Sequence, residues 1–407
     1  MNSKTRVQLS TLMFLQYFVW GTWYVTISTY LTNTLHFEPI YVGLSFGTLS
    51  IAAMVSPFFV GLVADKYFST EKVLGFLHVV GGVLLYIASM AKTFSFFYPA
   101  LLAYTLAYTP TIALSNSISF HQMKDPGKQF PGIRVLGTIG WIAAGITIGQ
   151  LKLEASVGQL HIGAVASVLL GIYCLTLPHV PPKKAIKASF REILGLDALK
   201  LFKNRGFAVV LIASVLTCIP LSFYYSWTNP FLNDIGMEYA ATKMTLGQAF
   251  EIVFLLIMPF FFAKLGVKKM LMLGMTAWIL RYLLFAYGNV GPLEWMLYLG
   301  IILHGICYDF FFVTGQIYVD KKAPDYLKAS AQGMITFATY GLGIFIGSWF
   351  AGKMVGLYTI EQNNQVIHQW TNIWYIPTII AIGVLIFFIL LFREKQDVTE
   401  GEVQAAV

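Results

Sequence analysis

Residues 301–319, IILHGICYDFFFVTGQIYV, have the length and apolar content of a membrane-spanning helix, yet they carry His304, Tyr308 and Asp309 near the middle. An ionisable carboxylate at membrane depth is energetically costly and usually faces an ion or solute path rather than lipid. A carboxylate paired for packing inside a helix bundle is the alternative interpretation. Asp309 therefore makes this span the first candidate for a functional site.

Composition places the chain among membrane proteins. Of its 407 residues, 57% are hydrophobic and 11% are charged, whereas a soluble domain carries about 25% charged residues. The net charge of +8 is dispersed over short loops between apolar runs, so no basic stripe suited to nucleic acid remains. The three cysteines lie inside apolar runs without motif spacing, which predicts neither a disulfide framework nor a metal site.

Apolar runs of about 20 residues, the length that a bilayer requires, recur along the whole chain. The first run is too long for a signal-peptide core, so we expect it to be retained. We predict twelve spans, at residues 8–30, 38–64, 71–92, 96–121, 131–150, 158–178, 207–232, 244–264, 268–287, 294–318, 329–352 and 370–392.

The predicted fold class is an all-α polytopic membrane protein with twelve transmembrane helices in two six-helix halves. We expect an N-terminal six-helix bundle at 1–178, a cytoplasmic linker at 179–206, a C-terminal six-helix bundle at 207–395 and a disordered cytoplasmic tail at 396–407. With both termini in the cytoplasm, 21 of the 27 Lys and Arg residues lie on the inner side and 4 on the outer side. This bias predicts that orientation.

An internal repeat supports two related halves. Residues 57–74, PFFVGLVADKYFSTEKVL, and 259–271, PFFFAKLGVKKML, each read as a Pro-Phe-Phe helix end, a tight basic turn and an apolar helix. Two related halves with sites between them near the membrane midplane are typical of transporters.

Polar side chains share faces on two further spans. Arg134, Thr138 and Trp141 follow i, i+4 and i+7 spacing, which puts a cation, a hydroxyl and a ring on one stripe. Alternatively, Arg134 is a snorkelling anchor, Thr138 a helix-contact residue and Trp141 an interfacial aromatic. Gln248 and Glu251 share a face at i, i+3.

Glu251 has a structural alternative, an ion pair with Arg134 or Arg281, and we expect Arg281 to be a buried cation with a carboxylate partner. Tyr308 can stack on a flat ring, or it is ordinary packing. His304 is either part of a site or a hydrogen-bonded core residue.

Several blocks resemble the nucleoside–proton symporter family of bacterial permeases, and the resemblance covers nearly the whole chain. Residues 61–66, GLVADK, resemble the G-x-x-x-D-(R/K) motif of the major facilitator superfamily to which that family belongs. The more specific blocks are FLQYFVWG at 14–21, IRVLGTIG at 133–140, LGLDA at 194–198, WILR at 278–281, YDFF at 308–311, SAQG at 330–333 and the Gln248/Glu251 pair.

The resemblance implies a proton-coupled nucleoside importer, a nucleoside–proton symporter with the major facilitator fold that works by alternating access in the bacterial inner membrane. Protons are the coupling ion, no other cofactor is expected, and we expect a monomer. Asp309 and Glu251 are the proton-coupling candidates, and Gly61 and Asp65 the gating residues. The implied substrate-binding residues are Arg134, Thr138, Trp141, Ser222, Tyr225, Gln248, Glu251, His304, Tyr308 and Asp309.

This chain departs from the family pattern at several of these positions. Ser222 and Tyr225 stand where relatives carry amides, His304 stands where a tyrosine is typical, and Tyr308 and Trp141 stand where phenylalanines are. The preference for purine or pyrimidine therefore stays open. A major facilitator transporter for a sugar or another small polar solute is the alternative function. An enzyme is not expected, because the sequence has no HExxH motif and no nucleotide-binding glycine loop.

Overall fold

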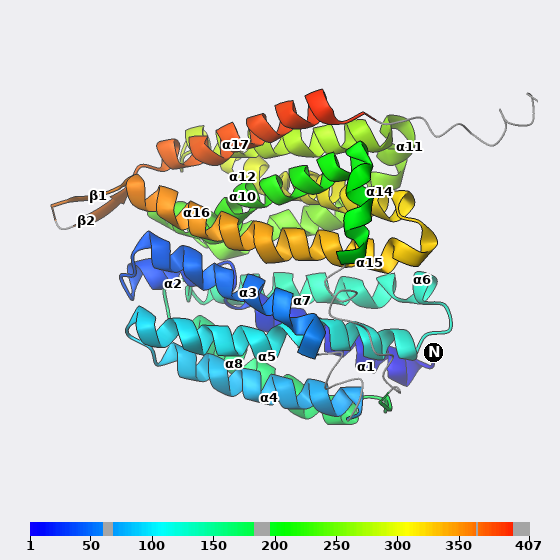
Figure 1. Cartoon of the computed structure of the whole chain (residues 1–407). Helices are drawn as coiled ribbons and strands as arrows, with labels where there is room; N and C mark the ends of the chain where they lie inside the picture. Colours follow the sequence, from blue (N-terminus) through cyan, green and yellow to red (C-terminus); the bar gives the residue numbers. More distant parts are fainter. Residues whose placement is uncertain (60–67, 183–195, 364, 394–407) are drawn as a thin grey trace, which may run out of the picture.

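The structure is a computed structural model that describes residues 1–59, 68–182, 196–363 and 365–393. The predicted gating residues Gly61 and Asp65, residues 183–195 of the predicted linker and all of the predicted tail lie outside the described residues. Long helices run side by side in two groups, α1 to α8 in the lower part of Figure 1 and α10 to α17 in the upper part.

The first group begins with a helix that is interrupted at residues 22–26. Most of the helices in this group are long enough to cross a bilayer. The elements are α1 (Ser3–Gly21), α2 (Ile27–Asn33), α3 (Pro39–Phe59), α4 (Thr70–Ser89), α5 (Phe94–His121), α6 (Pro126–Gln129), α7 (Pro131–Gln150), α8 (Gly158–Tyr173) and the short η2 (Cys174–Thr176).

The second group ends with a two-stranded antiparallel hairpin and a last helix. Thr359 pairs with His368 and Ile360 with Ile367 in the hairpin. The elements are η3 (Leu196–Lys203), α10 (Arg205–Asp234), α11 (Ala240–Tyr287), α12 (Glu294–Ile302), α13 (His304–Tyr308), η4 (Asp309–Val313), α14 (Thr314–Lys322), η5 (Asp325–Leu327), α15 (Lys328–Thr336), η6 (Phe337–Gly343), α16 (Ile344–Leu357), β1 (Thr359–Gln362), β2 (Gln365–His368) and α17 (Trp370–Leu391).

The number of spans agrees with the sequence. Nine of the described helices are long and apolar enough to cross a membrane. One of them, α11, has 48 residues and would be about 72 Å long, more than twice the thickness of the hydrocarbon core. Gly266, with φ of 66° and ψ of 177°, divides it into two spans. With the less apolar α5 and the α1–α2 pair, the described chain has the twelve predicted spans.

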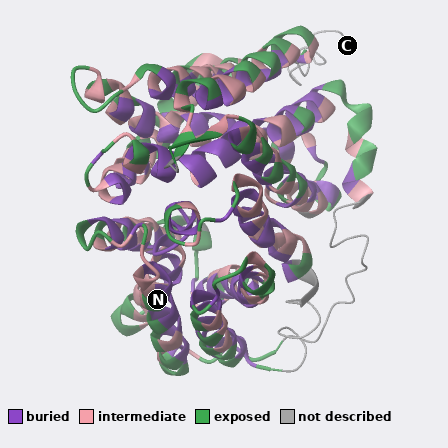
Figure 2. Ribbon diagram, turned by 90° about the vertical axis from the view of Figure 1, so that its left-hand side faces the viewer, coloured by how far each residue is buried: buried purple, intermediate pink, exposed green. Residues whose placement is uncertain are grey.

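Large apolar side chains cover the outside of the bundle. Leu256 is 75% exposed, Leu175 is 72% exposed and Phe76 is 67% exposed. Figure 2 shows buried residues on the helix faces that point into the molecule and exposed ones on the outer faces and loops. This is the arrangement expected for a protein whose outer surface contacts lipid.

Two spans contain π-helical turns. These are η4, which lies between α13 and α14, and η6, which lies between α15 and α16. A π-turn is uncommon and often occurs at a functional site. Gly274 of α11 lets the first one pack closely, because a Cβ there would lie 2.8 Å from the Cβ of Phe311.

A cluster of buried polar side chains in the first six spans is hydrogen-bonded around Gln16. The Gln16 amide donates to Thr111 at 2.7 Å, and its oxygen accepts from His78 at 2.8 Å and from Ser115 at 3.1 Å. These bonds join α1, α4 and α5. Such partners are needed because hydrocarbon supplies none.

The two groups touch through glycines at the end of the molecule that carries β1 and β2, which we call the hairpin end (Figure 1). A Cβ at Gly43 of α3 would collide with the Ser348 carbonyl of α16, and one at Gly352 with the Pro39 carbonyl. Gly149 of α7 makes a similar contact with Thr242 of α11. Small residues at helix contacts allow backbones to approach closely.

A buried carboxylate also joins the two groups at the hairpin end. Glu154, in the loop after α7, is 5% exposed. It accepts hydrogen bonds from Asn229 at 2.8 Å and Asn233 at 2.6 Å on α10, and from the backbone N–H of Ala241 at 2.8 Å. Thr29 of α2 donates to the Asn229 side-chain oxygen at 2.5 Å.

The described part of the predicted linker packs on the second group. Ala198 of η3 is buried with Phe207 and Ala331, whereas Leu199 and Phe202 are exposed. The boundaries of the two bundles, the linker and the tail stay predictions.

Single cysteines test the predicted topology. We expect Asn363→Cys, in the turn between β1 and β2, to react with a membrane-impermeant maleimide in intact cells, and Asp325→Cys, before α15, to react only after permeabilisation. Cys174, Cys218 and Cys307 are buried, so the wild-type protein is the unlabelled control. Labelling of Asp325→Cys in intact cells would contradict the predicted orientation and support the opposite one.

Candidate functional site

Three of the predicted site residues meet around the ring of His304. That ring is 1% exposed, stacks on Tyr224 of α10 with centroids 4.8 Å apart, and lies 6.0 Å from the rings of Tyr225 and Tyr308. Tyr308 precedes the π-turn at Asp309. The aromatic group therefore joins α10 to α13 in the interior of the bundle.

Glu251 lies beside the same histidine. Its Oε2 is 3.8 Å from His304 Nε2, and its side chain is 27% exposed, whereas that of His304 is 1% exposed. Close packing of α11 against α13 depends on glycine, since a Cβ at Gly305 would lie 2.8 Å from the Cα of Glu251. Glu251 makes no ion pair within 4.0 Å with Arg134 or Arg281, although the charge of Arg134 acts on it. Glu251 thus retains an accessible carboxylate.

Asp309 is the second acid of the cluster. It is 1% exposed, and its Oδ2 has no hydrogen-bond partner in the described part of the chain. The charge of Glu251 acts on it. A buried carboxylate oxygen without a partner is costly, so this oxygen is available to a proton or to a bound solute.

The predicted residues of α7 lie on the other side of the cluster. The Trp141 ring packs edge-on against Trp20, with centroids 5.1 Å apart, and lies 6.0 Å from Tyr24. The Arg134 guanidinium lies 4.1 Å from the centre of the Tyr17 ring. Thr138 is half-buried between them along the helix.

Two predicted residues make fewer contacts with this cluster. Gln248 is half-buried on α11, one turn before Glu251. Ser222 is buried on α10, where its hydroxyl donates to the Cys218 carbonyl of the same helix at 2.8 Å. A Cβ at Gly347 would lie 2.5 Å from the Ser222 hydroxyl, so Ser222 faces α16.

Arg281 contacts different groups from those expected. It is fully buried, and its Nε donates to the Gly300 carbonyl at 2.9 Å. Its other described partners are His304 Nδ1 and the rings of Tyr224 and Trp278, and none of these is a carboxylate.

Sequence reasoning missed Tyr340 and Tyr24. The hydroxyl of Tyr340, in the π-turn η6, is hydrogen-bonded to the Tyr308 hydroxyl. Tyr24 lies in the break between α1 and α2, with its ring 5.4 Å from that of Tyr225. Only weak features of the sequence point to these two residues. Tyr340 follows the SAQG block by seven residues, and Tyr24 is one helical turn after Trp20.

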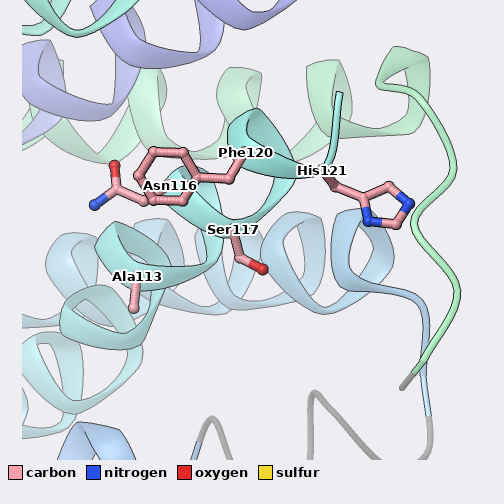
Figure 3. A pocket seen from close by; sticks show the side chains of 5 residues that line it. All are labelled: Ala113, Asn116, Ser117, Phe120 and His121. Atoms are coloured by element: carbon pink, nitrogen blue, oxygen red, sulfur yellow. The ribbon is translucent and has the colours of Figure 1, made fainter. Parts of the chain in front are cut away.

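A separate hollow of about 610 Å³ lies along α5. Its lining residues, shown in Figure 3, are Ala113, Asn116, Ser117, Phe120 and His121. None of them is a predicted site residue. The candidate site is therefore defined by the contacts of His304, Glu251 and their neighbours rather than by this hollow.

Twelve spans in two groups, with acids and aromatic rings gathered inside the bundle, define a multi-pass membrane transporter of the major facilitator type. A family model described as nucleoside H+ symporter matches residues 3–397, and the chain belongs to this nucleoside–proton symporter family. It is a transporter and not an enzyme.

Relatives and solved structures agree with that family. A candidate nucleoside transporter, YegT of Escherichia coli (strain K12), is 40% identical over 405 residues, which cover 97% of this chain and 95% of YegT. The nucleoside permease NupG of the same organism is 35% identical over 406 residues, 96% of each chain. A crystal structure of NupG has a TM-score of 0.88 at 35% identity, covering 97% of this chain and 100% of that one.

Replacing Glu251 tests whether its side chain contacts the substrate. We expect Glu251→Gln to weaken nucleoside binding to the purified protein about ten- to hundredfold, because a hydrogen bond to a charged group contributes about 1.5–3 kcal/mol. Isothermal titration calorimetry measures the change. Glu294→Gln, an acid-to-amide change at the Lys243 ion pair, is the matched control. Unchanged affinity in a folded Glu251→Gln protein would make Glu251 a structural residue.

Proposed function

We propose that this chain imports nucleosides together with protons across the bacterial inner membrane by alternating access. The observation that carries the proposal is the presence of two acids, the partly exposed Glu251 and the buried Asp309, beside a group of aromatic rings. Rings suit a flat base, and carboxylates suit ribose hydroxyls or protons. A nucleoside is uncharged, so accumulation requires a coupled ion. One proton moving down the membrane potential supplies about 2.3 kcal/mol per 100 mV, enough for tens-fold accumulation.

The substrate roles follow the chemistry of each side chain. Glu251 and Gln248 hold the ribose, and Trp141 and Tyr308 flank the base. The bond between the Tyr308 and Tyr340 hydroxyls fixes the Tyr308 ring, which supports a stacking role. The remaining residues of the proposed site are Arg134, Thr138, Ser222, Tyr225, His304 and Asp309.

Asp309 is the proposed proton carrier. Protonation of a carboxylate depends on burial and on nearby charges, so a site that opens alternately to either side binds and releases a proton as its surroundings change. Glu251 is the second candidate for the coupled proton, because its carboxylate is partly exposed beside the same aromatic rings.

We assign closure of the hairpin end to Glu154. The carboxylate belongs to the first six spans and its three donors belong to the last six. All these bonds must break before the halves separate at that end. Gly61 and Asp65 stay the predicted gating residues of the opposite end.

The proposed orientation puts the hairpin end outside and both termini in the cytoplasm, as the distribution of Lys and Arg supports. We infer that the transporter acts as a monomer, as the family resemblance implies.

Asp309→Asn tests the coupling. The asparagine keeps the shape of the carboxylate and removes its titratable proton, so we expect proteoliposomes to lose accumulation driven by a pH gradient. Nucleoside exchange at equal pH should survive in part. Asp325→Asn, at an exposed residue, is the control. If the Asp309→Asn protein still accumulates nucleoside in response to the gradient, Asp309 is not the coupling site.

Glu154→Gln tests the contact at the hairpin end. The side-chain amide of the glutamine would place its own N–H against the N–H donors that bind Glu154. The closed state should therefore be destabilised by about 1.5–3 kcal/mol relative to the open state. We expect Thr245→Cys, which lies against Gly145, to react with maleimide about tenfold faster in the Glu154→Gln background. Labelling in detergent makes the result independent of orientation.

The matched control is Glu38→Gln, an acid-to-amide change at an exposed residue before α3. Equal labelling rates in the two backgrounds would remove Glu154 from the closure mechanism.

A further inference from the structure

We propose that Arg281 is a positioning residue, which holds His304 as the neutral tautomer with its proton on Nε2 and directs that N–H toward Glu251 and the substrate. The statement about substrate recognition rests on the proposed function, whereas the assignment of the tautomer does not depend on it. The group of the substrate that meets His304 must then be a hydrogen-bond acceptor, such as a base carbonyl or a ribose oxygen.

Contacts other than the one to His304 hold the guanidinium of Arg281 in place. Its Nε donates to the Gly300 carbonyl at 2.9 Å, and its Cζ lies 4.0 Å from the centre of the Tyr224 ring and 5.2 Å from that of Trp278. Cation–π contacts of this kind are strong when water is excluded. The planar group is therefore held in one orientation, with Nη1 toward the histidine and Nη2 without a hydrogen-bond partner in the described part of the chain.

One N–H of the guanidinium points at the histidine. Arg281 Nη1 lies 3.3 Å from His304 Nδ1. A guanidinium has donors and no acceptor, so Nδ1 must accept and cannot carry a proton. The single proton of the neutral ring is then on Nε2. Stacking on Tyr224, with an angle of 19° between the rings, fixes the plane of the imidazole.

The opposite nitrogen faces the site. Nε2 lies 3.8 Å from Glu251 Oε2, which exceeds the length of a direct hydrogen bond. The Nε2–H is therefore a donor that a ligand oxygen or nitrogen can take, and Glu251 remains free to bind the same ligand.

The contact between Arg281 and His304 also keeps His304 from acting as a proton carrier. The groups that face its ring are Tyr224 and Tyr225 from α10 and Glu251 and Arg281 from α11, with Tyr308 on its own span. A second proton would have to bind Nδ1, where the Arg281 N–H already occupies the lone pair and a like charge would repel it. The coupled proton is left to the carboxylates of Asp309 and Glu251.

Solid-state NMR of protein labelled with ¹⁵N-histidine in liposomes tests the tautomer, because protonated and bare ring nitrogens differ widely in ¹⁵N shift. His304→Gln identifies the His304 signals among those of the seven histidines. We expect wild-type protein at pH 7 to show one tautomer, with Nε2 protonated and Nδ1 bare. A His304 signal from protonated Nδ1 in the wild-type protein would overturn the proposal.

Arg281 variants separate positioning from simple packing. In Arg281→Met we expect a second His304 signal, from protonated Nδ1, and about tenfold weaker nucleoside binding, the most that one lost neutral hydrogen bond explains. His304→Gln, which keeps an amide N–H donor, should bind better than His304→Phe. A single unchanged tautomer in folded Arg281→Met would also overturn the proposal.

The NMR result is independent of transport. A chain that binds no nucleoside but shows the expected tautomer contradicts the proposed function alone. A nucleoside importer with protonated Nδ1 contradicts the role of Arg281 alone.

Discussion

Hydrocarbon offers no hydrogen bonds, and this constraint organises the interior of the protein. The Gln16 amide meets it with hydrogen bonds to His78, Ser115 and Thr111, and Arg281 meets it with a carbonyl, a histidine nitrogen and two aromatic rings. Several buried polar atoms of the described residues have no hydrogen-bond partner, among them Arg281 Nη2 and the carboxylate oxygen Asp309 Oδ2. An unpaired carboxylate oxygen is costly in such surroundings, which supports the proposed role of Asp309 in binding a proton.

Much of the architecture was predictable, because hydrophobic runs set the spans and a bilayer sets their length. The two spans within α11 were predicted on either side of Gly266, at a tight basic turn. The π-turns at Asp309 and Phe337 were not, since hydrophobic periodicity does not reveal where one helical turn widens. The break at residues 22–26 was missed for the same reason.

The site shows where sequence spacing stops being informative. Pairs on one helix, such as His304 with Tyr308, follow from spacing alone, but contacts between helices do not. Arg281 was expected to pair with an acid and instead contacts His304. Ser222 faces α16, and Tyr340 reaches Tyr308 from a span with no predicted site residue. Each of these depends on which helices are neighbours.

The glycine contacts at Gly43, Gly352 and Gly149 have a mechanical consequence. Helix surfaces that lack side chains do not interdigitate. One helix can therefore roll or slide over the other while few side chains have to leave their packing positions. The two halves can then change their angle against a low frictional barrier. A few hydrogen bonds then determine the free-energy difference between the closed and open conformations. Binding of a solute or a proton can outweigh them.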